Sequence, residues 1–120
     1  MVEGDLTIKS GGTASKELLA RKDRPTAIFA SNDLMAIGTM KEIQGDGLKV
    51  PDDISIIGFD DILTASLVTP ALATIAQPKY EMGVEAMNLL IRMIEKKGAS
   101  KSKVVLDTRL VVRKSAKRPI

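Results

Sequence analysis

Cysteine and histidine are both absent from this sequence of 120 residues. Their absence excludes disulfide bonds, thiolate nucleophiles and imidazole bases, together with most zinc and haem ligation. Aromatic residues make up only 2% of the chain, namely Phe29, Phe59 and Tyr80, which argues against a surface of stacked rings for single-stranded nucleic acid. Carboxylates, lysine, serine and tyrosine remain available for catalysis. We nevertheless expect no catalytic residues, no metal site and no cofactor.

Long apolar runs are missing as well. No stretch approaches the roughly 18 residues needed to span a bilayer, and the first five residues lack the basic, apolar and small-residue pattern of a signal peptide. The 44% hydrophobic content is nevertheless sufficient for one core in a chain of this length. We expect a soluble cytoplasmic protein with no membrane partner.

Positive charge is in mild excess, with a formal net charge of +3, and it gathers at the C-terminal end. A DNA-binding surface needs many phosphate contacts on one rigid face, and nothing in the sequence resembles a helix-turn-helix. The basic end is therefore predicted to be a solvated tail, and the chain alone is not expected to bind DNA. The residues concerned are Arg109, Arg113, Lys114, Lys117 and Arg118.

Helical and strand-like patterns alternate along the chain. Apolar residues at helical spacing predict helices, and short continuous apolar runs predict strands of the kind that is buried on both faces of a parallel sheet. Such alternation is typical of an open α/β sheet. The predicted helices are residues 11–22 with Ser10 as N-cap, 33–45, and 79–97 ended by Gly98; the predicted strands are residues 26–30, 54–59, 73–76, 104–106 and 108–112.

Polar side chains follow three of the predicted strands. Asn32, Asp60 and Gln77 come directly after the strands that end near residues 30, 59 and 76. In open α/β sheets ligands bind beyond the carboxyl ends of the strands, and amides and a carboxylate suit the hydroxyls or ring nitrogens of a small polar ligand. Two alternatives remain open: Asn32 with Asp33 is an ordinary helix cap, and Asp60 with Asp61 is a solvated turn.

An enzyme, a hydrolase, is an alternative function, because two pairs of adjacent carboxylates occur, Asp52 with Asp53 and Asp60 with Asp61. Glycoside chemistry places its two carboxyl groups roughly 5 to 9 Å apart across the substrate, which neighbouring residues seldom achieve. The glycines around Asp46 form no phosphate-binding loop, because they lack its length and its lysine. The protein is therefore not expected to be an enzyme.

Taken together and in order, several stretches resemble the effector-binding domain of LacI/GalR transcriptional regulators. The resemblance implies a periplasmic-binding-protein-like type I fold, α/β with three αβα layers and a mostly parallel sheet, present here as an incomplete fragment. It also implies two lobes with the effector in the cleft between them, a homodimer, and a DNA-binding headpiece upstream that this chain lacks. The stretches are residues 4–6 with Ser10-Gly11, 30–38, 47–61, 69–75 with Gln77-Pro78, and 110–113.

The same resemblance implies a division of the chain and a ligand site. Residues 1–76 belong to the second lobe, residues 77–106 cross to the first lobe, and residues 107–120 return as a basic tail. Asn32, Asp60 and Gln77 match residues that contact the effector or line the cleft. Leu6 stands where several sugar- and purine-responsive members place an aromatic ring, so stacking at this wall is in question, and simple packing of Leu6 is the alternative.

The resemblance finally implies how the protein works. Ile37, Leu67 and Val68 match the dimer contact of the family, although Ile37 can instead pack in the chain's own core. The predicted function is the effector-sensing and dimerisation part of a transcriptional regulator that responds to a sugar or a related metabolite and contacts operator DNA only through the headpiece. The alternative is a fragment of a periplasmic sugar-binding transport protein of the same fold.

Overall fold

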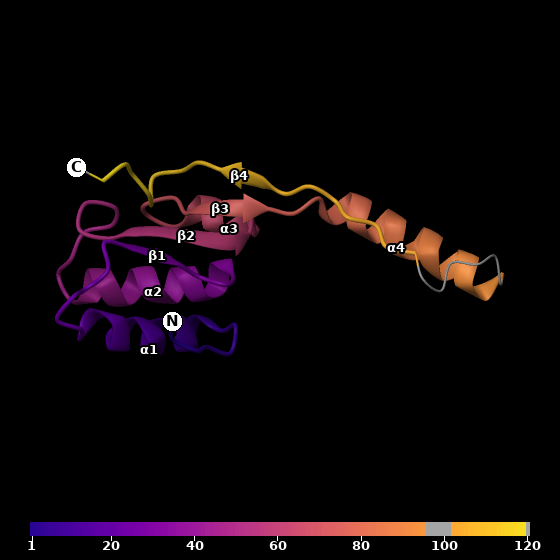
Figure 1. The fold of residues 1–120 in the computed structure, drawn as a ribbon. Helices are drawn as coiled ribbons and strands as arrows, with labels where there is room; N and C mark the ends of the chain where they lie inside the picture. Colours follow the sequence, from indigo (N-terminus) through magenta and orange to yellow (C-terminus); the bar gives the residue numbers. More distant parts are fainter. Residues whose placement is uncertain (96–101, 120) are drawn as a thin grey trace. The chain divides into compact units, whose positions relative to one another are not determined.

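The computed structural model describes residues 1–95 and 102–119. Helices and strands alternate through most of these residues, as the sequence patterns predict (Figure 1). In chain order the elements are α1 (Ile8–Leu19), β1 (Ala27–Phe29), α2 (Asp33–Gly45), β2 (Ser55–Asp60), α3 (Leu63–Leu67), β3 (Ala73–Ala76), α4 (Lys79–Ile94) and β4 (Arg109–Val111). The helix end expected at Gly98 lies outside the described residues.

Two compact units make up the chain. The first consists of Met1–Ala76 and Leu110–Ile120, and the second of Gln77–Arg109. The first unit holds α1, α2, α3 and the sheet apart from the first residue of β4, and the second unit holds α4.

The sheet has the order β1-β2-β3-β4. The first three strands are parallel, with Ile28 opposite Ile56 in one pair of strands and Asp60 opposite Ala76 in the next. Parallel strands end at the same edge of their sheet, so the segments that follow β1, β2 and β3 all leave from one edge. This arrangement confirms the predicted α/β fold with a mostly parallel sheet.

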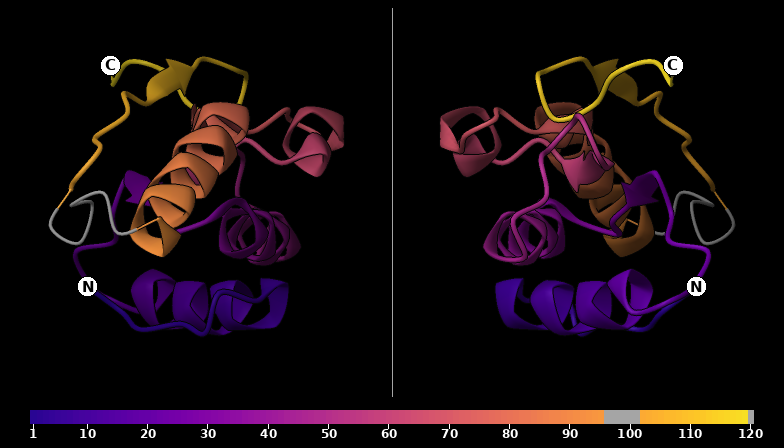
Figure 2. Two further views of the ribbon diagram at one scale, coloured as in Figure 1. Left: turned by 90° about the vertical axis from the view of Figure 1, so that its right-hand side faces the viewer. Right: turned by 90° about the vertical axis from the view of Figure 1, so that its left-hand side faces the viewer.

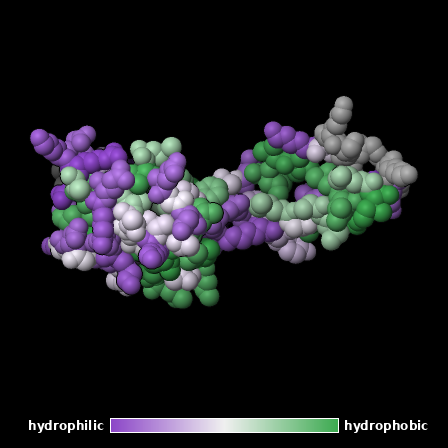
Figure 3. All heavy atoms as spheres, turned by 90° about the horizontal axis from the view of Figure 1, so that it is seen from below, coloured by the Kyte–Doolittle hydropathy of each residue, from purple (hydrophilic) through white to green (hydrophobic). Residues whose placement is uncertain are grey.

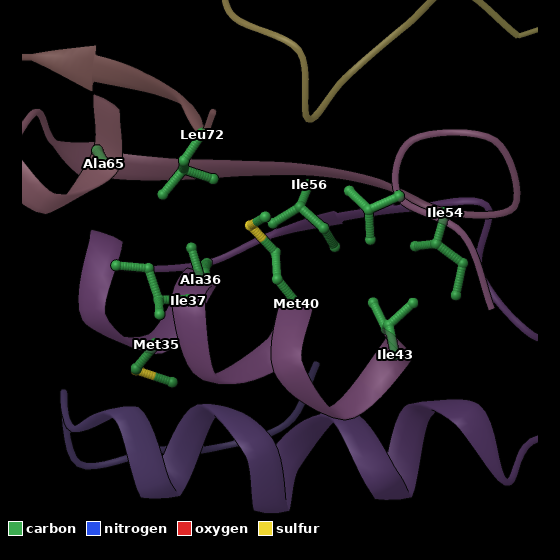
Figure 4. Close-up of a cluster of buried hydrophobic side chains, with 11 residues drawn as sticks. Met35, Ala36, Ile37, Met40, Ile43, Ile54, Ile56, Ala65 and Leu72 are labelled. Atoms are coloured by element: carbon green, nitrogen blue, oxygen red, sulfur yellow. The ribbon is translucent and has the colours of Figure 1, made fainter. Parts of the chain in front are cut away.

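One face of the sheet is covered by α2, and α1 lies beyond α2 on the same side (Figure 2). The side chains of Ala36, Met40 and Ile43 on α2 pack toward Ile54 and Ile56 on the sheet side (Figure 4). Burying a methionine or isoleucine side chain contributes about 1.5 to 3 kcal/mol. This contact is therefore the main core of the first unit.

Glycines set the spacing between α1 and α2. A Cβ atom at Gly11 would overlap the carbonyl oxygen of Met35, and one at Gly38 would overlap the carbonyl oxygen of Ile8. The two helices therefore pack backbone against backbone at Gly11 and Gly38, where a side chain would not fit. This close approach holds the start of α1, and the turn before it, against the start of α2.

Three local predictions were wrong. α1 begins two residues before Ser10, because the Thr7 hydroxyl accepts the N–H of Ser10 at 3.1 Å and so acts as the cap. β1 is not buried on both faces: Phe29 is 62% exposed and Ala27 is exposed on the same side of the strand, while only Ile28 between them packs against the core. Residues 104–106 form no strand, and only Arg109–Val111 of the last predicted strand do.

The prediction of a solvated C-terminal tail was also wrong for much of its length. Ser115 is fully buried, and its main-chain N–H and carbonyl bond to Ala71 and Ile56. Arg113 is paired with Asp61 at 2.7 Å, and Lys117 with Asp52 at 2.7 Å. The tail docks because main-chain N–H groups near the first residues of β2 and β3 need hydrogen-bond partners. The Ser115 carbonyl and hydroxyl accept those of Ile56 and Ala73.

Helix α4 differs from the others in that no residue in it is buried. Apolar side chains gather on its surface (Figure 3), and Met87, Leu90 and Ile94 are among the exposed ones. A solvent-exposed apolar patch of this kind usually contacts another surface. Among the described residues, no helix is long and apolar enough to cross a membrane.

Candidate functional site

The Asn32 side chain joins two segments at the carboxyl edge of the sheet. Its Oδ1 accepts the N–H of Met35 at 2.9 Å, which caps α2, and its Nδ2 donates to the carbonyl of Leu6 at 3.0 Å. The helix-cap alternative for Asn32 is therefore correct as a description of its oxygen. The amide nitrogen carries two N–H groups, and the bond to Leu6 uses one of them.

Leu6 itself has a left-handed backbone, with φ of 68°, and its side chain is 56% exposed. The turn around it is closed by Asp5, whose carboxylate accepts the N–H and the hydroxyl of Thr7. Hydrogen bonds from the side chains of Thr7 and Ser10 hold the pKa of Asp5 below its ordinary value. The exposed leucine is thus presented by a fixed turn and does not pack in the core.

Asp60 and Asp61 are the other two non-glycine residues with a left-handed backbone in the described part of the chain, with φ of 117° and 53°. Residues other than glycine rarely adopt such backbone angles, and each instance costs on the order of 1–3 kcal/mol. Conformations of this kind persist only where neighbouring groups enforce them, and they concentrate at ligand sites. All three of the left-handed non-glycine residues that the described part of the chain contains thus fall at sequence-predicted ligand positions or next to one.

Asp33 is the group that holds this edge together. Its carboxylate is fully buried and accepts the N–H of Ile62 at 2.9 Å and the hydroxyl of Thr74 at 2.6 Å. The Thr74 oxygen in turn accepts the N–H of Asp61 at 3.4 Å. Gly58 leaves room for this carboxylate, because a Cβ there would overlap Asp33 Oδ1. One carboxylate therefore links the start of α2 to β3 and to the turn after β2.

Arg113 holds the turn after β2 from the side of the C-terminal segment. Its Nη2 donates to Asp61 Oδ1 at 2.7 Å, and its Nη1 donates to the carbonyl of Leu72 at 2.9 Å. Both side chains of the ion pair are about four-fifths buried, which strengthens a charged hydrogen bond relative to one in water. Asp61 is therefore engaged in the structure, and the solvated-turn alternative does not describe it.

The predicted ligand residues are brought together only in part. Asn32 touches Leu6 directly, and Asp60 ends β2 at the same sheet edge that α2 begins from. Gln77 is the first residue of the second unit, where its carbonyl accepts the N–H of Lys79 at 2.9 Å. The first unit thus brings Leu6 and Asn32 into contact and places Asp60 at the same edge of the sheet, and their role as ligand residues stays a prediction.

Of the predicted dimer residues, Ile37 lies in the core cluster and is only 7% exposed (Figure 4). Its intramolecular alternative is the one the structure shows. Leu67 on α3 is 71% exposed, its neighbour Leu63 is 79% exposed, and Val68 is half-buried.

The residues that sequence reasoning missed act through other residues. Asp33 was considered only as part of a cap, although a second signal was present: Gly58 interrupts an apolar strand, and a strand glycine marks close approach by another group. Thr74 within the apolar run 73–76 is a similar signal for a buried hydrogen bond. Nothing local marks Arg113 or Ser115, whose partners lie more than 40 positions away.

Comparison with known proteins identifies the fold. Residues 2–116 match the family described as the periplasmic binding protein-like domain. The chain is similar to the HTH-type transcriptional repressor CytR of Escherichia coli (strain K12), with 40% identity over 117 residues, which are 98% of this chain and 34% of that protein. The chain spans about a third of the length of the curated relatives it matches.

Solved structures agree with this result. The transcriptional regulator CelR in complex with cellobiose matches with a TM-score of 0.89 and 35% identity, over 94% of this chain and 35% of that one. The lac repressor dimer bound to operator and the anti-inducer ONPF matches with a TM-score of 0.87 and 34% identity, over 95% of this chain and 40% of that one. The chain therefore belongs to the periplasmic binding protein-like domain family, in the form that LacI-family transcriptional regulators carry.

Proposed function

We propose that this chain senses a small-molecule effector, a sugar or a related metabolite, for a LacI-type transcriptional regulator. The observation that carries the proposal is the carboxyl edge of the sheet. There Asn32 caps α2 and bonds to Leu6 in the turn before α1, and Asp60 ends β2. An exposed apolar side chain beside an amide and a carboxylate suits a ligand that has both a carbon face and hydroxyl groups. The regulators among the relatives favour this function over a transport protein.

We also propose that the two compact units belong to the two lobes of the regulator. Residues 1–76 and 107–120 belong to the second lobe, and residues 77–106 to the first, with Gln77 contributing an amide to the cleft. The division of the chain near residues 76 and 109 supports this assignment. The exposed apolar side chains of α4 support it further, because further residues of the first lobe would cover them in the whole protein.

In the whole regulator, effector binding would alter operator affinity through the relative position of the lobes. Such coupling is reciprocal, so operator binding changes effector affinity by the same factor. The protein works as a cytoplasmic homodimer without catalysis, and contacts DNA through a separate headpiece. Leu67 and Val68 carry the proposed dimer contact, with Leu63 beside them, since Leu63 and Leu67 expose large apolar side chains on one short helix.

Calorimetry with a panel of sugars tests the proposal. Cellobiose, lactose and D-ribose are titrated separately into the regulator that contains this chain. We expect at least one of them to bind saturably with one site per chain. If none of the three releases or absorbs heat beyond the heat of dilution, the proposal of a sugar effector is wrong.

A further inference from the structure

The turn after β2 is strained in a way that its own sequence does not explain. Asp60 and Asp61 are consecutive residues with φ of 117° and 53°, and neither is glycine. The main-chain N–H groups of Asp61 and Ile62 both donate to side chains of other elements, the first to Thr74 on β3 and the second to Asp33 on α2. The conformation must therefore be imposed from outside the turn.

Arg113 holds the Asp61 side chain, but the two main-chain N–H groups of the turn are both held, directly or through Thr74, by one buried carboxylate. Asp33 Oδ2 accepts the N–H of Ile62 at 2.9 Å, while Asp33 Oδ1 accepts the Thr74 hydroxyl at 2.6 Å and thereby orients the oxygen that receives the N–H of Asp61. Asp33 is also the first residue of α2, where the helix N-terminus favours negative charge. Its position is fixed in turn by the cap that Asn32 forms on the same helix.

We propose that Asp33 is a positioning residue, which holds the Asp60–Asp61 turn in its left-handed conformation and so sets the direction of the Asp60 side chain. Asp33 is fully buried and does not itself touch the ligand. The part of this proposal that concerns the ligand rests on the proposed function. The part that concerns the turn does not, and it can be tested without any ligand.

NMR spectroscopy of the 120-residue chain provides the test. A residue with positive φ holds its amide proton close to its own α proton, which gives a strong cross peak between the two. We expect strong cross peaks at Asp60 and Asp61 in the parent chain and their loss in Asp33→Ala, while the signals of β1 stay in place. Asp53→Ala is the matched control, since that carboxylate accepts the N–H of Lys49 in a separate turn; it should leave both peaks unchanged.

Thr74 provides a second pair of variants in case Asp33→Ala does not fold. Thr74→Val removes the hydroxyl with little change of shape and should abolish the strong peak at Asp61, whereas Thr74→Ser keeps the hydroxyl and should retain it. Strong peaks that persist in Asp33→Ala or in Thr74→Val overturn the proposal. So does their loss in Thr74→Ser, or their absence from the parent chain. Failure of every sugar to bind would contradict the proposed function alone and leave this result standing.

Discussion

Replacing Ser115 by alanine should destabilise the first unit far more than a change near the chain end normally does. The Ser115 hydroxyl donates to the carbonyl of Ile56 at 2.6 Å and accepts the N–H of Ala73 at 2.8 Å. It therefore bridges β2 and β3 close to their first residues, at the start of their pairing, where Ala73 lies opposite Ile57. Ser115 and Ile56 are fully buried and Ala73 is 2% exposed, so water cannot readily replace the hydroxyl.

The magnitude follows from the two main-chain groups that the substitution leaves without their side-chain partner. A buried donor or acceptor without a hydrogen bond costs about 1 to 3 kcal/mol. With some relaxation of the surrounding chain, we expect Ser115→Ala to lower the free energy of unfolding by about 2 to 4 kcal/mol in total. This is a large share of the roughly 5 to 15 kcal/mol by which a typical domain is stable.

Urea unfolding measures this difference, provided the slope of free energy against urea concentration is the same for both proteins. Ser66→Ala is the matched control, because the Ser66 hydroxyl is exposed and donates only to the Leu63 carbonyl one turn earlier. It should change stability by no more than about 0.5 kcal/mol. An equally small effect of Ser115→Ala would refute the conclusion that the C-terminal segment is docked on the sheet.

Three further predictions concern packing, charge and assembly. Gly38→Ala should destabilise the chain by about 1 to 3 kcal/mol in urea unfolding, since its Cβ would overlap the α1 backbone, whereas Gly45→Ala, with nothing within 4 Å, should not. The hydrogen bond and charge of Lys117 lower the pKa of Asp52, so NMR titration should find it raised in Lys117→Met. The stabilisation by this pair is present above the unfolded-state pKa of Asp52 and is lost as pH falls through its lowered folded-state pKa. Leu67→Glu should convert the proposed dimer of the regulator to monomers in sedimentation, and an unchanged dimer would exclude this surface.

Local patterns were sufficient to predict the elements that position the site. The apolar runs around Ile56 and Ile75 are strands, and the polar residue Asn32 begins a helix, because each signal depends on neighbours within a few positions. Strand ends then indicate where a ligand site lies, since parallel strands share a carboxyl edge. The predicted residues at that edge, Leu6 and Asn32, are in contact although 26 positions separate them.

What the sequence did not predict depends on contacts between distant segments. Ser115 bonds to Ile56 across 59 positions, and composition alone suggested only a polar, basic end. Ile37 was assigned to a dimer contact from the family resemblance, with packing in the chain's own core as the alternative. In the structure α2 packs between the sheet and α1, and Ile37 is among its buried residues.

The affinity of Asp60→Ala for the tightest-binding sugar of the panel tests the central claim most directly. A carboxylate at a strand end forms charged hydrogen bonds to ligand hydroxyls, each worth about 1.5 to 3 kcal/mol. Isothermal titration calorimetry of the regulator should therefore show affinity weakened by roughly 10- to 150-fold, with Asp53→Ala unchanged as the matched control. Affinity of Asp60→Ala equal to that of the parent would contradict the account, because Asp60 would then lie outside the effector site.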